Sequence, residues 1–308
     1  MNWMFIYTYA SHEDEAALCE LELHTLLGQP VQNGFIKSNF EITADRSPFV
    51  KRRIEVLYEA GSLEELIALL PFIELEGKTF KVLFTAGDVK FTFEEQRMLE
   101  RTAGSVIRGQ AQMRGPEQLF GLTVWNGRWY FGLCEENSAL WLKHQKKPQN
   151  YSTALPTRAA RAIVNLAAGR DAAAIRMIDP CCGMGTVLIE AMSMGIPIEG
   201  VDLNPLAVRG ARANLAHFGY PNRVKLGDMR FIEDRYDAAI VDMPYNLCSV
   251  LPEKEQLDML ESVRKMSDHA VIVTTENVQQ QLEMANWQVK DCITLSKASF
   301  TRYVSVVE

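Results

Sequence analysis

The second half of the chain alternates short apolar runs with amphipathic segments, and this rhythm restricts the fold more than any other feature of the sequence. From residue 175 onward, apolar runs predict strands at 176–179, 198–202, 224–226, 236–242, 270–275, 288–295 and 301–307. Helices are predicted between them at 186–194, 205–217 and 253–265. Strands that alternate with helices form a mostly parallel, doubly wound sheet. We therefore predict an α/β fold, in which ligands bind at the carboxyl ends of the strands.

Two shorter patterns of mixed strands and helices precede this region. Residues 1–77 predict a small α+β unit, with strands at 5–9 and 34–42 and a helix at 13–27. Residues 78–147 predict a second unit, with a strand at 80–86, a helix at 92–107 and a hairpin at 121–133. The hairpin turns at Asn126-Gly127, and Asn-Gly is the dipeptide most typical of tight hairpin turns.

A polar stretch at 144–158 contains two prolines and is the candidate linker. A predicted helix at 157–168 then opens the last region. A chain of 308 residues is long enough for two or three domains, each with its own core. We expect three domains, with boundaries at 1–77, 78–147 and 148–308.

The amino-acid composition bears on where in the cell the protein is located and on whether it contains a metal site or disulfides. The chain is 47% hydrophobic, yet no segment approaches 18 uninterrupted apolar residues, so no transmembrane helix is expected. Acidic residues follow the short apolar start, which lacks a basic leader, and we expect a first strand and a cytoplasmic protein. The six cysteines form no C-x-x-C pair, so neither a metal site nor a disulfide framework is expected.

The net charge of −7 is unevenly distributed along the chain. Residues 1–77 carry 5 basic and 13 acidic side chains, whereas residues 78–147 carry 11 basic and 7 acidic ones. A locally basic segment is suited to contact phosphates, although a solvated surface of mixed charge fits the same numbers.

The first chemical motif is the sequence IDPCCGMGT at 178–186, where a predicted strand ends at Asp179 and a helix begins. Gly183 and Gly185 would let the backbone approach a ligand at positions where side chains would clash. The loop lacks the third glycine of a dinucleotide fingerprint and the lysine of a phosphate-binding loop. A simple turn between strand and helix explains it equally well.

Acidic residues follow the next two predicted strands. Asp202 lies about 20 residues after the glycine loop, where an acid is placed to bind ribose hydroxyls. It could instead cap the helix that begins at Pro205, although Asn204 is at least as good a cap. Asp228 ends the third strand and could accept a hydrogen bond from an adenine amine.

The fourth motif is IVDMPYN at 240–246. An apolar strand delivers Asp242, Pro244 and Tyr245 to the same carboxyl edge. They provide a hydrogen-bond acceptor, a rigid backbone carbonyl and an aromatic face. This set suits a planar base that bears an amine.

In this order, the motifs DPCCGMG, DLNP, GD and DMPY resemble those of the class I methyltransferase fold in amine-methylating enzymes. The upstream sequences at 80–107 and 119–133 resemble a THUMP domain, an RNA-binding module, and residues 1–77 are similar to the ferredoxin-like domain that precedes it. The segment 152–168 is similar to the entry into the catalytic domain of THUMP-containing tRNA guanine-N2 methyltransferases. The resemblance covers nearly the whole chain.

The resemblance implies S-adenosylmethionine as the methyl donor and tRNA as the partner. Its cofactor-binding residues would be Asp179, Cys181, Gly183, Gly185 and Thr186 for the methionine part, Asp202 for the ribose, and Asp228 and Met229 for the adenine. The catalytic residues would be Asp242 and the Pro244 carbonyl, which accept hydrogen bonds from the base amine, and Tyr245, which stacks on the extruded base. No metal and no membrane partner are expected.

Two departures from the family pattern leave the identity of the base open. Met243 stands where a second proline is commonest, and Asn246 replaces a glycine. The alternatives are an adenine-N6 methyltransferase acting on RNA or DNA, and a non-catalytic RNA-binding protein that retains the fold. A cysteine-dependent pyrimidine methyltransferase is disfavoured because no cysteine stands beside Pro244. The sequence does not determine the tRNA position, the number of methyl groups added or the oligomeric state.

Overall fold

A computed structural model describes residues 3–151, 154–244, 252–297 and 300–308. The chain folds into two compact units. The first comprises Met1–Ala10 and Leu27–Ser138, and the second comprises Ser11–Leu26 and Ala139–Glu308. Among the described residues, no helix combines the length and apolarity needed to cross a bilayer.

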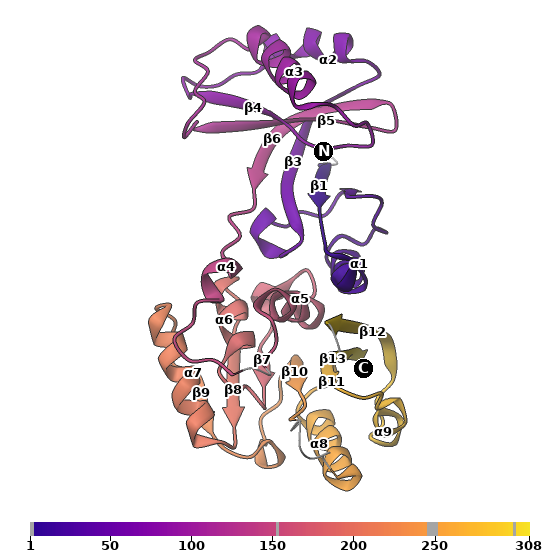
Figure 1. Ribbon diagram of the computed structural model, residues 1–308, viewed down its shortest axis with the longest axis vertical. Coiled ribbons are helices and arrows are strands. Elements are labelled where there is room, and N and C mark those ends of the chain that lie inside the picture. Colours follow the sequence, from indigo (N-terminus) through magenta and orange to yellow (C-terminus); the bar gives the residue numbers. More distant parts are fainter. Residues whose placement is uncertain (1–2, 152–153, 245–251, 298–299) are drawn as a thin grey trace. The chain divides into compact units, whose positions relative to one another are not determined.

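The first unit is built on one six-stranded sheet with the strand order β2-β1-β3-β6-β5-β4 (Figure 1). Its strands are β1 (Phe5–Tyr9), β2 (Phe35–Ser38), β3 (Val50–Ala60), β4 (Phe80–Phe84), β5 (Gln118–Trp125) and β6 (Arg128–Glu136). Neighbours are antiparallel except β4 and β5. The predicted hairpin joins β5 to β6, and Asn126 and Gly127 both have the positive φ that its tight turn requires.

The domain boundary predicted at residue 77 falls inside this sheet. The long strand β3, from the first predicted domain, pairs with β6, from the second, between Arg52 and Ala60. The other edge of β3 pairs with β1, so each side of this strand finds its backbone partners in a different segment. The segments 1–77 and 78–147 therefore share one sheet.

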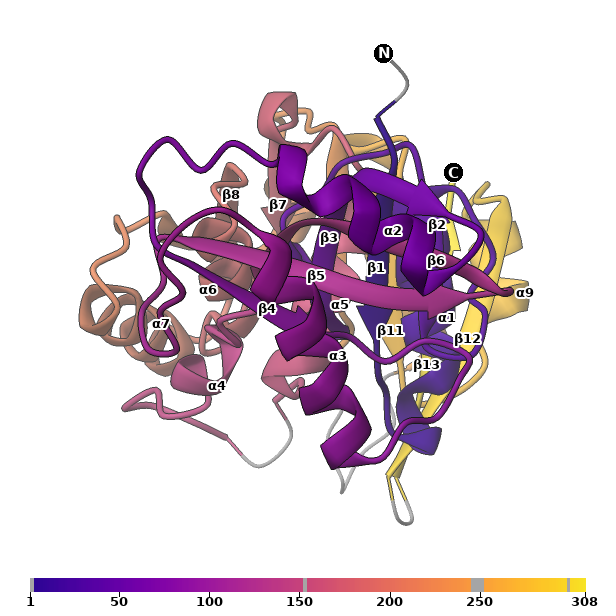
Figure 2. The same ribbon diagram turned by 90° about the horizontal axis from the view of Figure 1, so that it is seen from above.

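Two helices cover one face of this sheet, as Figure 2 shows from above. They are α2 (Leu63–Leu69) and α3 (Phe93–Val106). The first 72 residues also form the short 3-10 turns η1 (Glu13–Glu15), η2 (Ala44–Arg46) and η3 (Leu70–Phe72). The start of α3 is fixed by a capping box, in which the Thr92 hydroxyl and the Glu95 carboxylate each accept the other's backbone N–H. Leu66 and Leu99 from the helices pack against Phe120 and Phe131 from the strands.

The second unit is built on a seven-stranded sheet with the order β12-β13-β11-β10-β7-β8-β9, which runs from right to left in Figure 1. Its strands are β7 (Met177–Asp179), β8 (Ile198–Asp202), β9 (Val224–Leu226), β10 (Ala238–Asp242), β11 (Ala270–Thr274), β12 (Val289–Lys297) and β13 (Phe300–Val307). The strands from β11 to β9 are parallel, whereas β12 and β13 are antiparallel to their neighbours. The predicted α/β, mostly parallel fold is confirmed.

The helices of this unit are α4 (Trp141–His144), α5 (Thr157–Ala168), α6 (Thr186–Ser193), α7 (Pro205–His217), α8 (Glu253–Met266) and α9 (Gln279–Met284), with the 3-10 turns η4 (Ala172–Ala174) and η5 (Met229–Phe231). Helices α5, α6 and α7 contact one another in sequence, and α8 contacts α9. Ala239 and Val241 of β10 pack into the core formed with α8 and α9. Because side chains alternate along a strand, the intervening buried Ile240 faces the other side, so the strand is covered on both faces.

Helix α1 (Ala16–Leu27) belongs almost entirely to the second unit, although the sequence analysis assigns it to an N-terminal domain. Its buried Glu22 accepts a hydrogen bond of 2.6 Å from the Asn165 amide of α5. Just before α1, Glu15 forms an ion pair with Arg158 of α5. The sequence does not reveal this placement of α1, because the residues of each contact are 143 positions apart along the chain.

Candidate active site

A cavity of about 720 Å³ opens at the carboxyl edge of the seven-stranded sheet. The turns that follow β7, β8, β9 and β10 line it, together with residues before α5. Of the residues singled out from the sequence, it brings together Asp179, Cys181, Gly183, Thr186, Asp202, Asp228, Met229, Asp242 and Pro244. Its volume is in the range that holds a cofactor-sized ligand. Tyr245 lies outside the described residues.

The glycine loop between β7 and α6 uses its two glycines differently. Both have positive φ, 50° at Gly183 and 76° at Gly185, so both positions favour glycine. A Cβ at Gly183 would meet only the Tyr151 ring, at 3.6 Å, and this glycine lines the cavity. A Cβ at Gly185 would lie 3.3 Å from the Cβ of Ala211, so Gly185 permits close packing of α7 and does not itself line the cavity.

Asp202 ties the end of β8 to the glycine loop. Its Oδ2 accepts a hydrogen bond of 2.8 Å from the Gly183 N–H, and its Oδ1 accepts one of 2.8 Å from the Asn204 N–H. Helix α7 is capped by Asn204, whose Oδ1 accepts from the Leu206 N–H, so Asp202 is not the cap. A carboxylate has about four acceptor positions, and Asp202 therefore retains capacity for ribose hydroxyls.

Asp228, after β9, is already engaged by a neighbour. Its carboxylate accepts hydrogen bonds from the Arg230 backbone N–H and guanidinium, at 2.9 Å to Oδ1 in each case. These hydrogen bonds hold the pKa of Asp228 below its usual range. An adenine amine would share this carboxylate with Arg230. Beside it, the Sδ of buried Met229 lies 3.6 Å from the Cys181 Sγ, which forms an apolar patch of the cavity wall.

Asp242 is the last residue of β10, and this position brings its side chain to the cavity. Its Oδ1 is buried, and no described residue donates a hydrogen bond to it. Burial raises the pKa of Asp242 to about 7, although the positive charge of Arg302 opposes the rise. An unpaired buried acceptor is costly. It is accommodated most readily where a ligand supplies the missing donor.

Met243, the position that departs from the family pattern, has a structural role. Its side chain is buried in the core that β10 forms with α8, and its backbone N–H donates to the Val273 carbonyl at 2.9 Å. An apolar side chain thus fills this position without disturbing Asp242 or Pro244. The second departure, Asn246, lies outside the described residues.

The cavity has a strongly acidic lining. Five carboxylates and a single guanidinium line it: Asp179, Asp202, Asp228, Asp242, Glu255 and Arg230. Burial raises the pKa of Asp179 well above its usual range, and the charges of Asp242 and Asp202 raise it further. Asp179 is therefore largely protonated at neutral pH, and Asp228 is paired with Arg230. The negative charge of the lining comes from Asp202, Glu255 and the ionised fraction of Asp242, and it disfavours phosphate groups and favours a ligand that carries positive charge.

The cysteines at the cavity are not activated. Burial, and after it the nearby charge of Asp179, raises the pKa of both Cys181 and Cys182 well above the usual thiol range. A nucleophilic cysteine requires a lowered pKa. These two residues therefore give no support to cysteine-dependent pyrimidine methylation, and Cys248 lies outside the described residues.

The segment before α5 contributes residues to the cavity that the sequence motifs did not predict. Tyr151 and Leu155 line it, and the ammonium of Lys147 donates to the Thr186 hydroxyl at 2.9 Å. The signal in the sequence that could have indicated them is the aromatic ring of Tyr151 within the otherwise polar segment 144–158. No periodic pattern joins this segment to the strand ends.

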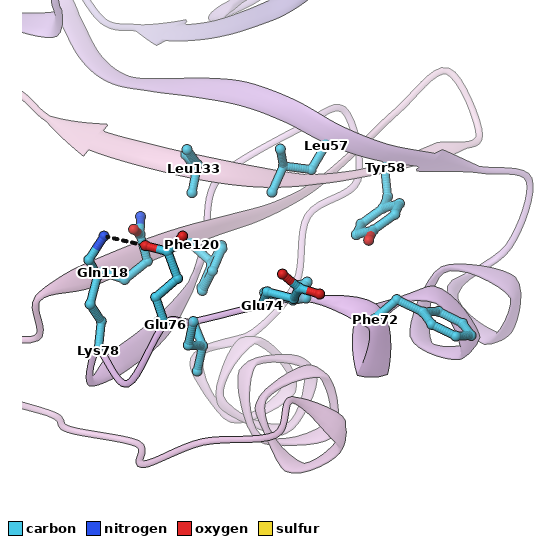
Figure 3. A pocket seen from close by; sticks show the side chains of 11 residues that line it. Leu57, Tyr58, Phe72, Glu74, Glu76, Lys78, Gln118, Phe120 and Leu133 are labelled. Atoms are coloured by element: carbon cyan, nitrogen blue, oxygen red, sulfur yellow. Dashed lines mark ion pairs between the residues drawn. The ribbon is translucent and has the colours of Figure 1, made fainter.

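The first unit contains a smaller cavity of about 290 Å³, shown in Figure 3. Leu57 and Leu133 enter it from neighbouring strands, and the exposed ring of Phe72 lies at its rim. Glu76 pairs with Lys78 at 3.7 Å, and Glu74 adds a second carboxylate. With two carboxylates and one ammonium in its lining, this cavity is poorly suited to a phosphate group.

The fold and the cavity together have the arrangement typical of class I methyltransferase domains: parallel strands flanked by helices, with an acid at or directly after the end of each of four strands around one cavity. Residues 144–292 match the family model described as RMKL-like, methyltransferase domain.

Curated relatives include two archaeal enzymes named tRNA (guanine(10)-N2)-dimethyltransferase. The protein from Methanothermobacter thermautotrophicus is 31% identical over 177 residues, which cover 53% of this chain and 51% of the relative. The protein from Pyrococcus abyssi is 36% identical over 116 residues, which cover 36% and 34%. The chain spans about half, or less, of the length of these relatives.

The solved structure of TrmN from Thermus thermophilus resembles the whole chain. The TM-score is 0.50 at 19% identity, and the match covers 99% of each chain. At this identity the likeness concerns the fold alone.

Proposed function

We propose that this protein transfers a methyl group from S-adenosylmethionine to an exocyclic base amine in RNA, with guanine N2 in tRNA as the target. The observation that carries the proposal is the Oδ1 of Asp242, which lies beside Pro244 in the cavity and is buried without a hydrogen-bond partner among the described residues. The methyltransferase family match and the guanine-N2 specificity named for the archaeal relatives support it.

The residues around the cavity fit S-adenosylmethionine. The cofactor carries a positive sulfonium group, and such a group fits a cavity lined mainly by acidic side chains better than the phosphates of a dinucleotide would. Asp202 would bind the ribose hydroxyls, Asp228 and Met229 the adenine, and the loop from Asp179 to Thr186 the amino-acid end. The sulfonium supplies an activated methyl group, so the hard chemistry belongs to the cofactor.

The protein's contribution would be to prepare the base amine. An exocyclic amine is a poor nucleophile because its lone pair is delocalised into the ring. Asp242 Oδ1 and the Pro244 carbonyl would each accept a hydrogen bond from the amine, which favours its pyramidal form and aims the lone pair at the methyl group. Asp242 would take the proton that the amine releases, a task for which a pKa of about 7 is well matched. Tyr245 would provide the stacking face for the extruded base.

The first unit would supply RNA affinity, with the segments similar to ferredoxin-like and THUMP domains acting as one module. In and around α3, four exposed basic residues form no ion pair with any described residue: Lys90, Arg101, Arg108 and Arg114. Phe93, Met98 and Met113 are exposed in the same segments. Cations interleaved with exposed apolar side chains are suited to phosphates and unstacked bases. A tRNA partner would place the protein in the cytoplasm.

Nucleoside mass spectrometry tests the function directly. Purified protein would be incubated with S-adenosylmethionine and with tRNA isolated from a strain that lacks the gene, and Asp242→Asn protein would serve as the matched control. We expect a new N2-methylguanosine or N2,N2-dimethylguanosine signal with the native protein and no such signal with the variant. N6-methyladenosine would instead establish the adenine alternative, and cofactor binding without any methylated nucleoside would favour the RNA-binding alternative.

A further inference from the structure

Arg302 of β13 lies at the same edge of the seven-stranded sheet as Asp242 and on the same face. Asp242 pairs with Val273 of β11, and Val273 pairs with Val304 of β13, so these residues form one row across strands that are neighbours in Figure 1. Directly paired residues share a face, as do residues two apart along a strand. Because β13 runs antiparallel to β11, Arg302 lies beyond this row, toward the carboxyl ends of β10 and β11.

The core contacts of the intervening residues confirm which face this is. Val241 and Ile272 alternate with the residues of the row and belong to the core formed with α8 and α9. Asp242 and Arg302 therefore lie on the opposite face, where α5 contacts β10 and β11. Leu155, just before α5, lines the cavity together with Asp242. A ligand that reaches Asp242 over this face comes next to the strand that carries Arg302.

The two charged groups are close enough to act on each other. Burial raises the pKa of Asp242, and the positive charge of Arg302 opposes the rise. Neighbouring strands lie about 4.8 Å apart, so β13 and β10, with β11 between them, are separated by about 10 Å. The side chains of Arg302 and Asp242 span part of this separation. A guanidinium has five N–H donors, so Arg302 can bind a ligand in addition to its contacts within the protein.

An acid and a cation in this arrangement match one base better than the other. Guanine carries a donor amine at N2 and an acceptor oxygen at O6, on either side of ring atom N1, whereas adenine has no oxygen. We propose that Arg302 donates a hydrogen bond to O6 of guanine while Asp242 accepts one from the N2 amine, so that Arg302 selects guanine over adenine. The inference rests on the proposed function and names the residue that decides the base, which the sequence motifs leave open.

Single-turnover methyl transfer to three tRNAs tests this assignment. One tRNA carries guanosine at the position that the native protein methylates. The second carries 2-aminopurine riboside there, which keeps the 2-amino group but has hydrogen in place of O6, and the third carries 2,6-diaminopurine riboside, which has an amine in place of O6. We expect guanosine to react about ten-fold faster than 2-aminopurine, or more, as loss of one hydrogen bond to a charged group predicts. 2,6-Diaminopurine should react more slowly still, because its second amine would face the donors of Arg302.

Variants attribute the preference to this one side chain. Arg302→Met should lower the rate on guanosine to near the rate on 2-aminopurine, so that the ratio of the two rates approaches one, and Arg302→Lys should retain part of the ratio. The accompanying change in the ionisation of Asp242 affects both tRNAs alike and leaves the ratio unaltered. Lys290→Met, which removes an exposed cation from the neighbouring strand β12, should retain the whole ratio.

The outcomes separate this inference from the proposed function. Equal native rates on guanosine and 2-aminopurine, or a ratio that Arg302→Met and Arg302→Gln both leave unchanged, would overturn the inference alone. If neither variant folds, the native rates decide, and a rate on 2,6-diaminopurine equal to or above that on 2-aminopurine would overturn it. Failure of the native protein to methylate any guanosine in tRNA would instead overturn the proposed function.

Discussion

At the scale of single residues, the feature with the greatest consequence is the carboxyl group of Asp242. Its Oδ1 is buried without a donor among the described residues, and burial raises its pKa to about 7. Unpaired buried groups of this kind often mark functional sites, where stability is lost in favour of chemistry. Asp242 therefore links the stability of the domain to its proposed activity.

We predict that Asp242→Asn separates activity from stability. The amide cannot take the amine's proton, so the single-turnover rate of methyl transfer should fall by about 100-fold or more, as when a general base is lost. Unfolding exposes Asp242 and returns its pKa to the ordinary, lower value, so the native state binds more protons between those two values and the native protein loses stability as pH rises through this window. At pH 8 the variant should melt above the native protein, by about 2–4 °C for each kcal/mol recovered.

The control for this prediction is Asp171→Asn, which changes an exposed aspartate of the same unit and should alter neither quantity. If Asp242 only stabilised the turn after β10, the Asp242→Asn protein would instead have a lower melting temperature than the native protein at pH 8. Normal single-turnover rates in Asp242→Asn would remove this residue from the chemistry.

The pH dependence of methyl transfer should report the same carboxyl group. The ionised form is the acceptor, so the single-turnover rate should rise with pH through about 7. Arg302 lowers the pKa of Asp242, and Arg302→Gln should therefore move the half-maximal rate to higher pH. The measurement is a single-turnover profile from pH 5.5 to 9 for both proteins, with a melting scan at each pH. A profile that does not move would show that the Arg302 charge does not act on the reacting group.

At the scale of elements, helix α1 is the clearest case of a segment whose place is decided by distant partners. Leu18, Leu23 and Leu26 are fully buried, and Glu22 meets Asn165 of α5 with both side chains fully buried. An element from the beginning of the chain thus completes the helical layer beside the sheet that carries the cavity.

We predict that Glu22→Ala destabilises the second unit. It leaves the Asn165 amide without this acceptor in a buried position, which costs about 1–3 kcal/mol, and it adds a small cavity. Glu22→Gln keeps an oxygen acceptor and should cost less. Urea denaturation followed by S-adenosylmethionine binding would measure both, with exposed Glu20→Ala as the control. Equal midpoints for the Glu22→Ala and Glu20→Ala proteins would contradict the role of this contact.

At the scale of the whole molecule, the chain builds its two units from interleaved segments. It leaves the first unit after Ala10, returns at Leu27 and leaves again after Ser138. The second unit therefore cannot be obtained by removing everything before the linker. Its buried His144, which contacts Glu190, also lies before residue 150.

A fragment of residues 150–308 should accordingly be much less stable than the full chain. It would lack α1, and it would leave Glu190 without His144 and Thr186 without Lys147. We expect a lower melting temperature, and weaker S-adenosylmethionine binding even where the fragment remains folded. A fragment that melts and binds like the full chain would show that these segments contribute nothing to the domain.

RNA binding should depend on the first unit. Replacing Lys90, Arg101, Arg108 and Arg114 with glutamine should weaken tRNA binding and reduce the slope of log affinity against log salt by about 3–4, if each cation neutralises one phosphate. The affinity for S-adenosylmethionine should stay unchanged, and the single exposed change Lys51→Gln should leave tRNA binding near native. Filter binding between 50 and 200 mM salt is the measurement. An unaltered slope would place the RNA contacts elsewhere.

The sequence by itself determined the order of the seven strands and of the helices α5, α6, α7 and α8 in the second unit, and the edge where the acids meet. The short helices α4 and α9 were not predicted. These features are local: periodicity distinguishes strand from helix, glycines permit positive φ, and acids that end parallel strands are brought to one edge. Asp179, Asp202, Asp228 and Asp242 accordingly surround one cavity. The prediction for Tyr245 lies outside the described residues and stays a prediction.

Tertiary structure alone decided the features that depend on distant contacts. The pairing of β3 with β6 places the expected boundary at residue 77 inside one sheet, and α1 joins a unit whose other segment begins only at Ala139. The Oδ1 of Asp242, which has no hydrogen-bond partner in the described part of the chain, and the ammonium of Lys147 are both buried by residues far away in sequence. No local pattern encodes such burial, because the pKa of a carboxyl or an ammonium group is set by the solvent it loses and by the charges that packing brings near.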